Sequence, residues 1–425
     1  MEHKPITNCH AHCFTLDHVP NEFAKTMVPF SSLFTVHWIK KYRVIRWLIK
    51  LLNKKWVIWI LKRFNPNIEA SVQRLLAFIR FLDDDSIPQT QQALIDRLRS
   101  YYPTDSRFVL LTMDMEFMDA GLPDKSFEKQ LTDLEDIKKK PEYKDIIYPF
   151  VFADPRRPGV TTIVTEKLAS GNFNGIKIYP ALGYFPFDIR MKEIYEYALK
   201  HDLPITTHCI PGSVHFRGSK VDTFNGKTHH PIACKQPLWG ENNYDFTQNF
   251  THPLNFECLM NPTLLEKIWK EDTVNFENLK ICIGHFGGEE QWVNYLNNTW
   301  LPDSTVINEN DPLETKNPWF DNDPDHPKAF SWFSIICPMM RKYKNMYADI
   351  SYMLSDERIM PLLKMLLTAD EYSGISNRIL FGTDYFLVEK AGSERELSIR
   401  LRSYLGEDLF NKIAKDNPEK FLNIK

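Results

Sequence analysis

Residues Ile6–Phe14 have the sequence ITNCHAHCF, a short run of apolar and polar residues that contains two histidines. His10 and His12 are two positions apart, so both side chains point to the same face if the run forms a strand. Neutral imidazole is the commonest metal ligand in proteins, and two of them on one strand face can share one ion. Because such pairs also occur by chance, the rest of the chain decides what this pair means.

Seven further runs of apolar and β-branched residues follow, and helical stretches separate most of them. The runs are Phe108–Met115, Ile146–Ala153, Gly175–Tyr179, Leu203–Cys209, Leu279–Phe286, Met346–Ser351 and Arg378–Tyr385. Near-continuous apolar strands of this length are typical of a parallel sheet that is buried on both faces. The clearest helical stretches are Ser126–Lys139, Val160–Ser170, Met191–His201 and Pro361–Ala369.

The alternation of strands and helices predicts βαβ units with right-handed crossovers, and eight strands favour a closed barrel over an open sheet. No G-x-G-x-x-G motif follows the first run, which weakens the dinucleotide-binding alternative. A length of 425 residues suits one barrel with insertions. We therefore predict an α/β fold, a (β/α)8 TIM barrel, in which residues 1–425 form a single domain.

The overall composition is that of an ordinary globular protein. Hydrophobic residues make up 43% of the chain, charged residues 25%, and the formal net charge is −3. This composition shows no bias toward nucleic acid or an acidic partner, so we expect no nucleic-acid partner. The seven cysteines follow no repeating spacing, which favours a reducing compartment over a disulfide framework. Because no signal peptide or long uncharged apolar stretch is recognisable, we predict a cytoplasmic protein.

Three segments exceed a minimal barrel: residues 15–107, 210–278 and 287–344. All three leave from the C-terminal ends of predicted strands, the side on which barrel enzymes carry their active sites. We expect the first to be a mainly helical insertion or lid. The other two are predicted to be long loops that shape a substrate pocket.

The first of these segments contains a basic amphipathic stretch. Phe23–Ile68 has no acidic residue, and between residues 38 and 64 lysine and arginine interleave with Trp, Ile and Leu. Three interpretations stay open: helices packed over the barrel mouth, a homo-oligomer or partner surface, and a peripheral helix on anionic lipid. The last is an alternative because cationic amphipathic helices rich in Trp bind membranes.

Three more polar side chains lie near the C-terminal ends of otherwise apolar runs. His208 lies near the end of the fifth predicted strand, His285 near the end of the sixth, and Asp384 near the end of the eighth. Each one alone is as readily a core or capping residue held by a hydrogen bond. In a barrel, however, the strand ends converge on one pocket. The joint pattern predicts a metal site with imidazole and carboxylate ligands at the barrel mouth.

Four motifs carry a resemblance to a known family: N-C-H-A-H at 8–12, T-T-H-C at 206–209, G-H-F-G-G at 284–288 and F-G-T-D-Y at 381–385. Together they resemble the amidohydrolase superfamily. More narrowly, they resemble its amidohydrolase-2 branch, which includes small-acid hydrolases and the aminocarboxymuconate-semialdehyde decarboxylase group. The resemblance extends to the closing N-P-E-K-F-L from residue 417 and does not cover residues 15–107.

This resemblance implies metal ligation by His10, His12, His208 and Asp384, with His285 activating or positioning the nucleophilic water. Asp384 is alternatively a base just outside the coordination shell, so His285 and Asp384 are both catalytic candidates. We expect one divalent ion per chain rather than two, with zinc as the first candidate and manganese or another metal as the alternative. Zinc with an open position lowers the pKa of its water to around 7.

Lys177, in the fourth predicted strand, is a further candidate. In binuclear relatives a lysine on this strand is carbamoylated and bridges two metals, whereas in mononuclear members a basic residue there contacts substrate; a structural role is the third alternative. A charged Lys177 favours an anionic substrate group. Asp114, Glu116 and Asp349 also lie at or near strand ends, where an acid either faces the pocket or caps a helix.

The resemblance implies a metal-dependent hydrolase that uses a metal-activated water on an ester, lactone or amide bond of a small, carboxylated substrate. Non-oxidative decarboxylation, which related barrels perform with the same ligands, is the alternative. A third hypothesis is a non-catalytic barrel that binds a membrane or a partner through residues 38–64. Metal-free protein that partitions onto liposomes would favour this last hypothesis.

Overall fold

The computed structural model of the chain describes residues 4–23, 54, 90–211, 214–218, 250–270, 274–297, 331–385 and 393–424. These residues contain an eight-stranded parallel sheet whose neighbours follow the sequence order, from β1 to β8. The strands are β1 (Thr7–His12), β2 (Arg107–Leu111), β3 (Ile147–Phe152), β4 (Gly175–Lys177), β5 (Ile205–Thr206), β6 (Ile281–Ile283), β7 (Met346–Asp349) and β8 (Ile379–Leu380).

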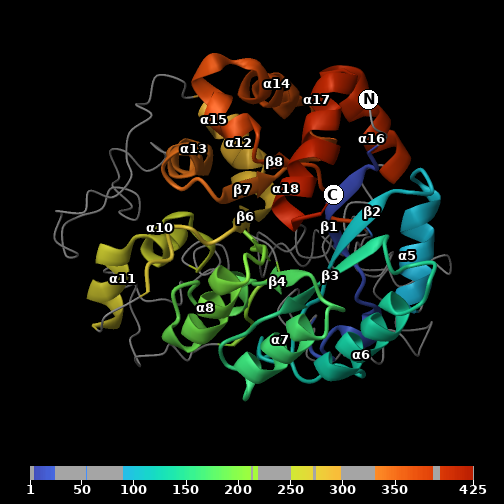
Figure 1. Cartoon of the computed structure of the whole chain (residues 1–425), viewed down its shortest axis with the longest axis vertical. Helices are drawn as coiled ribbons and strands as arrows, with labels where there is room; N and C mark the ends of the chain where they lie inside the picture. Colours follow the sequence, from blue (N-terminus) through green and yellow to red (C-terminus); the bar gives the residue numbers. More distant parts are fainter. Residues whose placement is uncertain are drawn as a thin grey trace.

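The last strand returns to the first. Ala11 of β1 forms a parallel bridge with Tyr385, just beyond β8. The Cys9 amide also donates to the Phe381 carbonyl at 2.8 Å. The sheet is thus a nearly closed (β/α)8 barrel with helices packed around its strands (Figure 1). This architecture confirms the fold class predicted from the sequence.

The helices of the described residues lie mostly between the strands. They are α5 (Gln91–Ser100), α6 (Phe127–Lys138), α7 (Val160–Ala169), α8 (Lys192–Lys200), α10 (Leu254–Met260), α11 (Pro262–Trp269), α12 (Glu289–Asn297), α13 (Trp332–Lys342), α14 (Met360–Thr368), α15 (Ser373–Ser376), α16 (Glu394–Leu405), α17 (Glu407–Asn411) and α18 (Asn417–Leu422). The four helices expected from the sequence are α6, α7, α8 and α14. Helix α6 begins where Ser126 accepts a hydrogen bond from the Lys129 amide, as an N-cap does.

The strands are shorter than the apolar runs that predicted them. β5 covers only Ile205–Thr206 and β8 only Ile379–Leu380. Residues beyond the last ladder bond stay buried but leave the sheet, and the chain after β6 turns at once into the short helix η5 (Gly284–Gly287). Hydrophobicity reports burial rather than strand geometry, so the runs extend into the barrel mouth, where the candidate site lies.

Two apolar clusters divide the core. One joins alternate residues of the strands, among them Cys9, Val109, Phe150 and Leu380, and therefore fills the inside of the barrel. Phe421 of α18 belongs to the same cluster and contacts the Tyr347 ring at 5.0 Å between centroids. The larger cluster packs the opposite strand faces against the helices. The barrel is therefore a packed core rather than a pore.

Several sequence predictions concern residues outside the described ranges. The basic stretch 38–64, apart from Lys54, lies outside them, as do residues 219–249 and 298–330 of the two predicted loops. The lid, partner, membrane and homo-oligomer interpretations therefore stay predictions. Of the helices in the described ranges, none combines the length and apolarity needed to cross a membrane.

Candidate metal centre

Three of the predicted residues meet at the seam between the first and last strands. His10, His12 and Asp384, hereafter the His/Asp cluster, have potential ligand atoms within 4.8 Å of one another, and all three are buried. Asp384 Oδ1 lies 3.1 Å from His12 Nε2 and 3.5 Å from His10 Nε2. The Asp384 amide donates to the His10 carbonyl at 2.8 Å, so the pairing of β1 with the end of β8 brings these side chains together.

The backbone at the site adopts unusual conformations. Asp384 has φ 65° and His285 has φ 62°, values in the left-handed region that residues other than glycine rarely adopt. A residue other than glycine in this conformation destabilises the fold by on the order of 1–3 kcal/mol, and it is found only where surrounding contacts hold it there. The preceding Gly284 allows close approach, because a Cβ there would lie 2.3 Å from the Thr207 carbonyl oxygen. Glycine at position 284 therefore lets the chain pass close to the end of β5 as it turns after β6.

Asp349, at the end of β7, holds residues of the site in place through hydrogen bonds. Its Oδ2 accepts from His10 Nδ1 at 2.9 Å and from Cys282 Sγ at 3.5 Å. Its Oδ1 accepts from the His285 amide at 3.1 Å, the Ser351 amide at 3.0 Å and the Ser351 hydroxyl. His10, His285 and Asp349 also lie close enough to hold an ion. Because both Asp349 oxygens are already occupied by donors, the His/Asp cluster is the better metal site.

The protonation of His10 follows from its neighbours. Its Nδ1 faces the Asp349 carboxylate, which only accepts, so Nδ1 carries the proton and Nε2 keeps its lone pair. Burial lowers the pKa of His10 to about 4, with the nearby Lys177 charge acting in the same direction and Asp349 opposing. The ring is therefore neutral near pH 7. Its Nε2 is buried without a hydrogen-bond partner among the described residues.

His12 and Asp384 complete an arrangement that fits a cation. Both ring nitrogens of His12 face acceptors, Nδ1 the Leu111 carbonyl at 3.3 Å and Nε2 the Asp384 carboxylate at 3.1 Å. A neutral ring can supply a proton to only one of them. Burial would raise the pKa of Asp384, but His12, His285 and His10 outweigh it and lower the pKa, so the carboxylate is charged.

The 3.1 Å contact from His12 Nε2 lacks the geometry of a hydrogen bond, so Asp384 Oδ1 is also buried without a hydrogen-bond partner in the described part of the chain. Buried polar atoms are rarely left in this state, because each one costs roughly 1–3 kcal/mol. Imidazole nitrogens and a carboxylate oxygen are the ligand set of zinc and related divalent metals. The residues present therefore fit a divalent metal ion.

His208 and His285 lie beside this cluster and contact each other. His285 Nε2 is 2.9 Å from His208 Nδ1, and the rings of His10 and His285 are 4.7 Å apart. The His208 ring stacks on Tyr179 at 4.0 Å. Burial lowers the pKa of both imidazoles, more strongly for His208. Within the described residues, neither of the three-residue groups that could hold an ion includes His208, so its role as fourth ligand stays a prediction.

Lys177 is buried at the end of β4 within the same region. Its Nζ donates to the Thr207 carbonyl at 3.3 Å and lies 5.8 Å from the centre of the Tyr179 ring. Burial lowers the pKa of Lys177 to about 8, while Asp349 and Asp384 act in the opposite direction. Its charge in turn lowers the pKa of His10, His208 and His285, which places it electrically within the site.

Comparison with known proteins identifies the family. The sequence matches the family described as Amidohydrolase over residues 9–424. The chain belongs to the amidohydrolase family. This confirms the resemblance to the amidohydrolase-2 branch, and the match runs through residues 15–107, which the strand motifs do not cover.

One solved structure shows a distant similarity to this amidohydrolase. An amidohydrolase from Mycobacterium avium subsp. paratuberculosis K-10, known from a crystal structure, is 13% identical, with a TM-score of 0.39. That match covers 78% of this chain and 74% of the other. No curated protein matches the sequence. The family assignment therefore rests on the match over residues 9–424.

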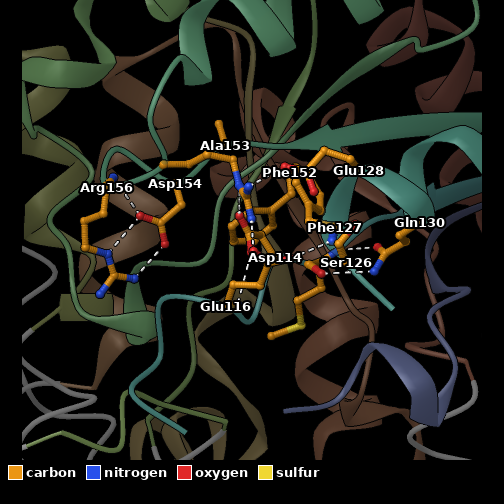
Figure 2. Close-up of polar contacts among 12 residues, drawn as sticks. Asp114, Glu116, Ser126, Phe127, Glu128, Gln130, Phe152, Ala153, Asp154 and Arg156 are labelled. Atoms are coloured by element: carbon orange, nitrogen blue, oxygen red, sulfur yellow. Dashed lines mark hydrogen bonds and ion pairs between the residues drawn. The ribbon is translucent and has the colours of Figure 1, made fainter. Parts of the chain in front are cut away.

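Two strand-end acids of the amidohydrolase lie in a different cluster (Figure 2). Arg157 Nη2 donates to Glu116 at 2.8 Å, and the same guanidinium contacts Asp114 and Glu128. We call these four residues the arginine network. Glu116 also accepts from the Phe127 amide at 2.7 Å, which fixes the first turn of α6. These acids therefore tie the loops after β2 and β3 to a helix and do not join the His/Asp cluster.

The sequence pattern places Asp349 among the strand-end acids but does not predict the contacts that Asp349 and Ser351 make with the histidines. The available signal was an acid inside the apolar run Met346–Ser351, since a buried carboxylate must find several donors. The tandem Arg156 and Arg157 after β3 similarly signalled paired acids nearby. Arg156 binds Asp154 through Nε at 2.9 Å and Nη2 at 2.6 Å (Figure 2).

Proposed function

We propose that this amidohydrolase is a metal-dependent hydrolase that directs an activated water at an ester, lactone or amide bond of a small, carboxylated substrate. His10, His12 and Asp384 would hold one divalent ion, with zinc as the first candidate and His208 as a fourth ligand. One observation carries the proposal. Two buried imidazoles and a charged carboxylate face one another, and His10 Nε2 and Asp384 Oδ1 lack hydrogen-bond partners among the described residues.

When bound, the ion would supply Lewis-acid stabilisation of developing negative charge and a lowered pKa for a bound water. The protein's own part is proton transfer and orientation. His285 is buried and its lowered pKa keeps it neutral near pH 7, so it can accept a proton within the site. Lys177, in its charged form, would attract a carboxylate of the substrate into the buried mouth.

Lys177 is also consistent with a second function, non-oxidative decarboxylation. In that reaction its ammonium group would hold the carboxylate that is lost as carbon dioxide, and a proton would replace it on the substrate. The buried position of Lys177, in a region that also contains Asp349 and Asp384, is the observation that favours this alternative. The two reactions differ in one measurable respect, because only hydrolysis incorporates oxygen from solvent.

The test is a substrate screen on the zinc-loaded protein in water enriched in oxygen-18. Matched esters, lactones and amides with and without a carboxylate are compared, and carbon dioxide release is followed in parallel. We expect solvent oxygen in the product, faster turnover of carboxylated substrates, and loss of both in Asp384→Asn. Asp114→Asn, from the arginine network, is the matched control and should retain turnover.

Two results would contradict the proposed hydrolysis. Carbon dioxide release without solvent oxygen in the product would establish the decarboxylase alternative instead. Turnover that persists in Asp384→Asn and in chelator-treated protein would show that the His/Asp cluster is not the reactive centre.

A further inference from the structure

Ser351, two residues beyond Asp349, contacts two groups of the site at once. Its hydroxyl oxygen lies 2.8 Å from His285 Nδ1 and makes a short hydrogen bond to Asp349 Oδ1. The Ser351 carbonyl oxygen is a second neighbour of the same ring nitrogen, at 3.3 Å. All three residues are buried, so these hydrogen bonds are shielded from bulk water.

Counting protons fixes the direction of each bond. A serine hydroxyl has one proton to donate, and a carboxylate can only accept. The Ser351 proton therefore points to Asp349, which leaves the hydroxyl oxygen as an acceptor toward His285. The Ser351 carbonyl is also an acceptor. Both neighbours of His285 Nδ1 thus require an N–H there, and Nε2 of the neutral ring keeps the lone pair.

The assignment extends to the next histidine. His285 Nε2, having no proton, accepts the hydrogen bond across the 2.9 Å contact from His208 Nδ1. His208 therefore carries its proton on Nδ1, and its own Nε2 keeps a lone pair. On the other side, Asp349 Oδ2 accepts from His10 Nδ1 and leaves His10 Nε2 unprotonated. One carboxylate thus decides which nitrogen is available on three imidazoles.

We propose that Ser351 is a positioning residue, which together with Asp349 locks His285 in the Nδ1–H tautomer and, through it, orients His208. Asp349 acts on His10 directly and on His285 through the Ser351 hydroxyl. The catalytic significance of this lock rests on the proposed function, because His285 can receive a proton only on Nε2, the nitrogen that the lock leaves unprotonated.

The main chain supports the same unit. Asp349 Oδ1 accepts from the His285 amide at 3.1 Å and from the Ser351 amide at 3.0 Å. The carboxylate that orders the protons therefore also holds both backbones in place. This is why the left-handed conformation at His285, with φ 62°, can be maintained.

The direct test is nitrogen NMR of the metal-free protein with 15N-labelled histidine. The His285 signals are assigned by their absence in His285→Gln. We expect native His285 to show a proton-bearing Nδ1 and a lone-pair Nε2. Ser351→Ala removes the closer of the two acceptors and keeps the backbone carbonyl, so it should shift both signals part of the way toward the values of a ring that exchanges between tautomers. Ser351→Thr, which keeps the hydroxyl, should preserve the native pattern. Ser351→Cys, with a weaker donor, serves if the alanine variant does not fold.

Zinc binding provides the second readout. Asp349→Asn should weaken zinc binding by about 10- to 100-fold, because His10 loses the acceptor that fixes its tautomer. Ser351→Ala leaves the His10 contact intact and acts on His208 only through His285, so it should weaken zinc binding less than Asp349→Asn does. With a substrate in hand, Ser351→Ala should lower kcat by about 10- to 100-fold with KM little changed.

The outcomes separate this inference from the proposed function. A native His285 with its proton on Nε2, or identical His285 signals in native protein and Ser351→Ala, would overturn the tautomer lock even if zinc binds. Native tautomers as predicted, in a protein that binds no zinc, would support the lock and refute the proposed metal-dependent function.

Discussion

The His/Asp cluster and the arginine network each contain a buried acid at the end of a barrel strand, Asp384 and Asp114, yet these acids differ in how they are satisfied. Arg157 supplies donors to Asp114, Glu116 and Glu128, so the arginine network is complete within the chain. In the His/Asp cluster, Asp384 Oδ1 and His10 Nε2 lack partners among the described residues. Paired acids of the first kind stabilise the fold by themselves. Buried polar atoms without partners are what we expect at a site that binds a ligand.

Removing Arg157 should give the largest change in stability. Arg157→Ala leaves Asp114 buried without its guanidinium, which typically costs about 3–5 kcal/mol. Denaturant unfolding of the metal-free protein measures this change, and zinc binding should stay near native. Arg358→Ala, at an exposed pair with Asp356, is the control and should change stability much less, because solvent screens such a pair. Equal effects of the two variants would show that the arginine network is not structural.

Zinc binding should stabilise the protein through the His/Asp cluster and not through the arginine network. Zinc at about 100 times its Kd should stabilise the native protein by about 2.7 kcal/mol, because only the folded state assembles the site. Asp384→Asn should lose this stabilisation, and Asp114→Asn should keep it. Thermal unfolding with and without zinc measures both. Stabilisation by zinc that survives in Asp384→Asn would mean that the ion binds elsewhere.

The pH dependence of the metal-free protein should differ in sign between the two regions. Burial lowers the pKa of His10 from 6.5 to about 4, so the unfolded chain binds more protons between these values. Stability should therefore fall as pH drops through this window, by about 1.4 kcal/mol per pH unit for one proton. His10→Gln should flatten this loss.

Asp114 acts in the opposite direction. Burial raises its pKa from 3.8 to about 6, although Arg157 opposes the shift, so the folded protein binds the extra proton between these values. Asp114 therefore adds stability as pH falls, and that contribution disappears as pH rises through about 6. Asp114→Asn should steepen the acid loss seen in urea unfolding between pH 6 and 4. A flatter profile in this variant would contradict the assignment.

The sequence was sufficient for the barrel because eight apolar runs and the helices between them are set by burial alone. It was also sufficient to bring His10, His12 and Asp384 together, since strand order places the ends of β1 and β8 side by side. It did not separate Asp349 from Asp114 and Glu116. All three are strand-end acids, and only the placement of Arg157 decides which of them are already neutralised.

Other features depend on geometry that a linear pattern does not carry. The left-handed backbone at His285 and Asp384 is enforced by surrounding contacts rather than by residue type. His208 occupies the predicted strand end, and its contact with His285, 2.9 Å between Nδ1 and Nε2, does not follow from the sequence pattern. The single-domain organisation, the cytoplasmic location and the role of residues 38–64 stay predictions.

Metal content per chain, measured by mass spectrometry, tests the central claim most directly. Native protein, the Asp114→Asn control and the double variant His10→Ala/His12→Ala are purified without chelator, and their folding is checked by circular dichroism. We predict close to one divalent ion in the native protein and in the control, and none in the folded double variant. No ion in folded native protein, or an ion retained by the double variant, would contradict the assignment of the His/Asp cluster as the metal site.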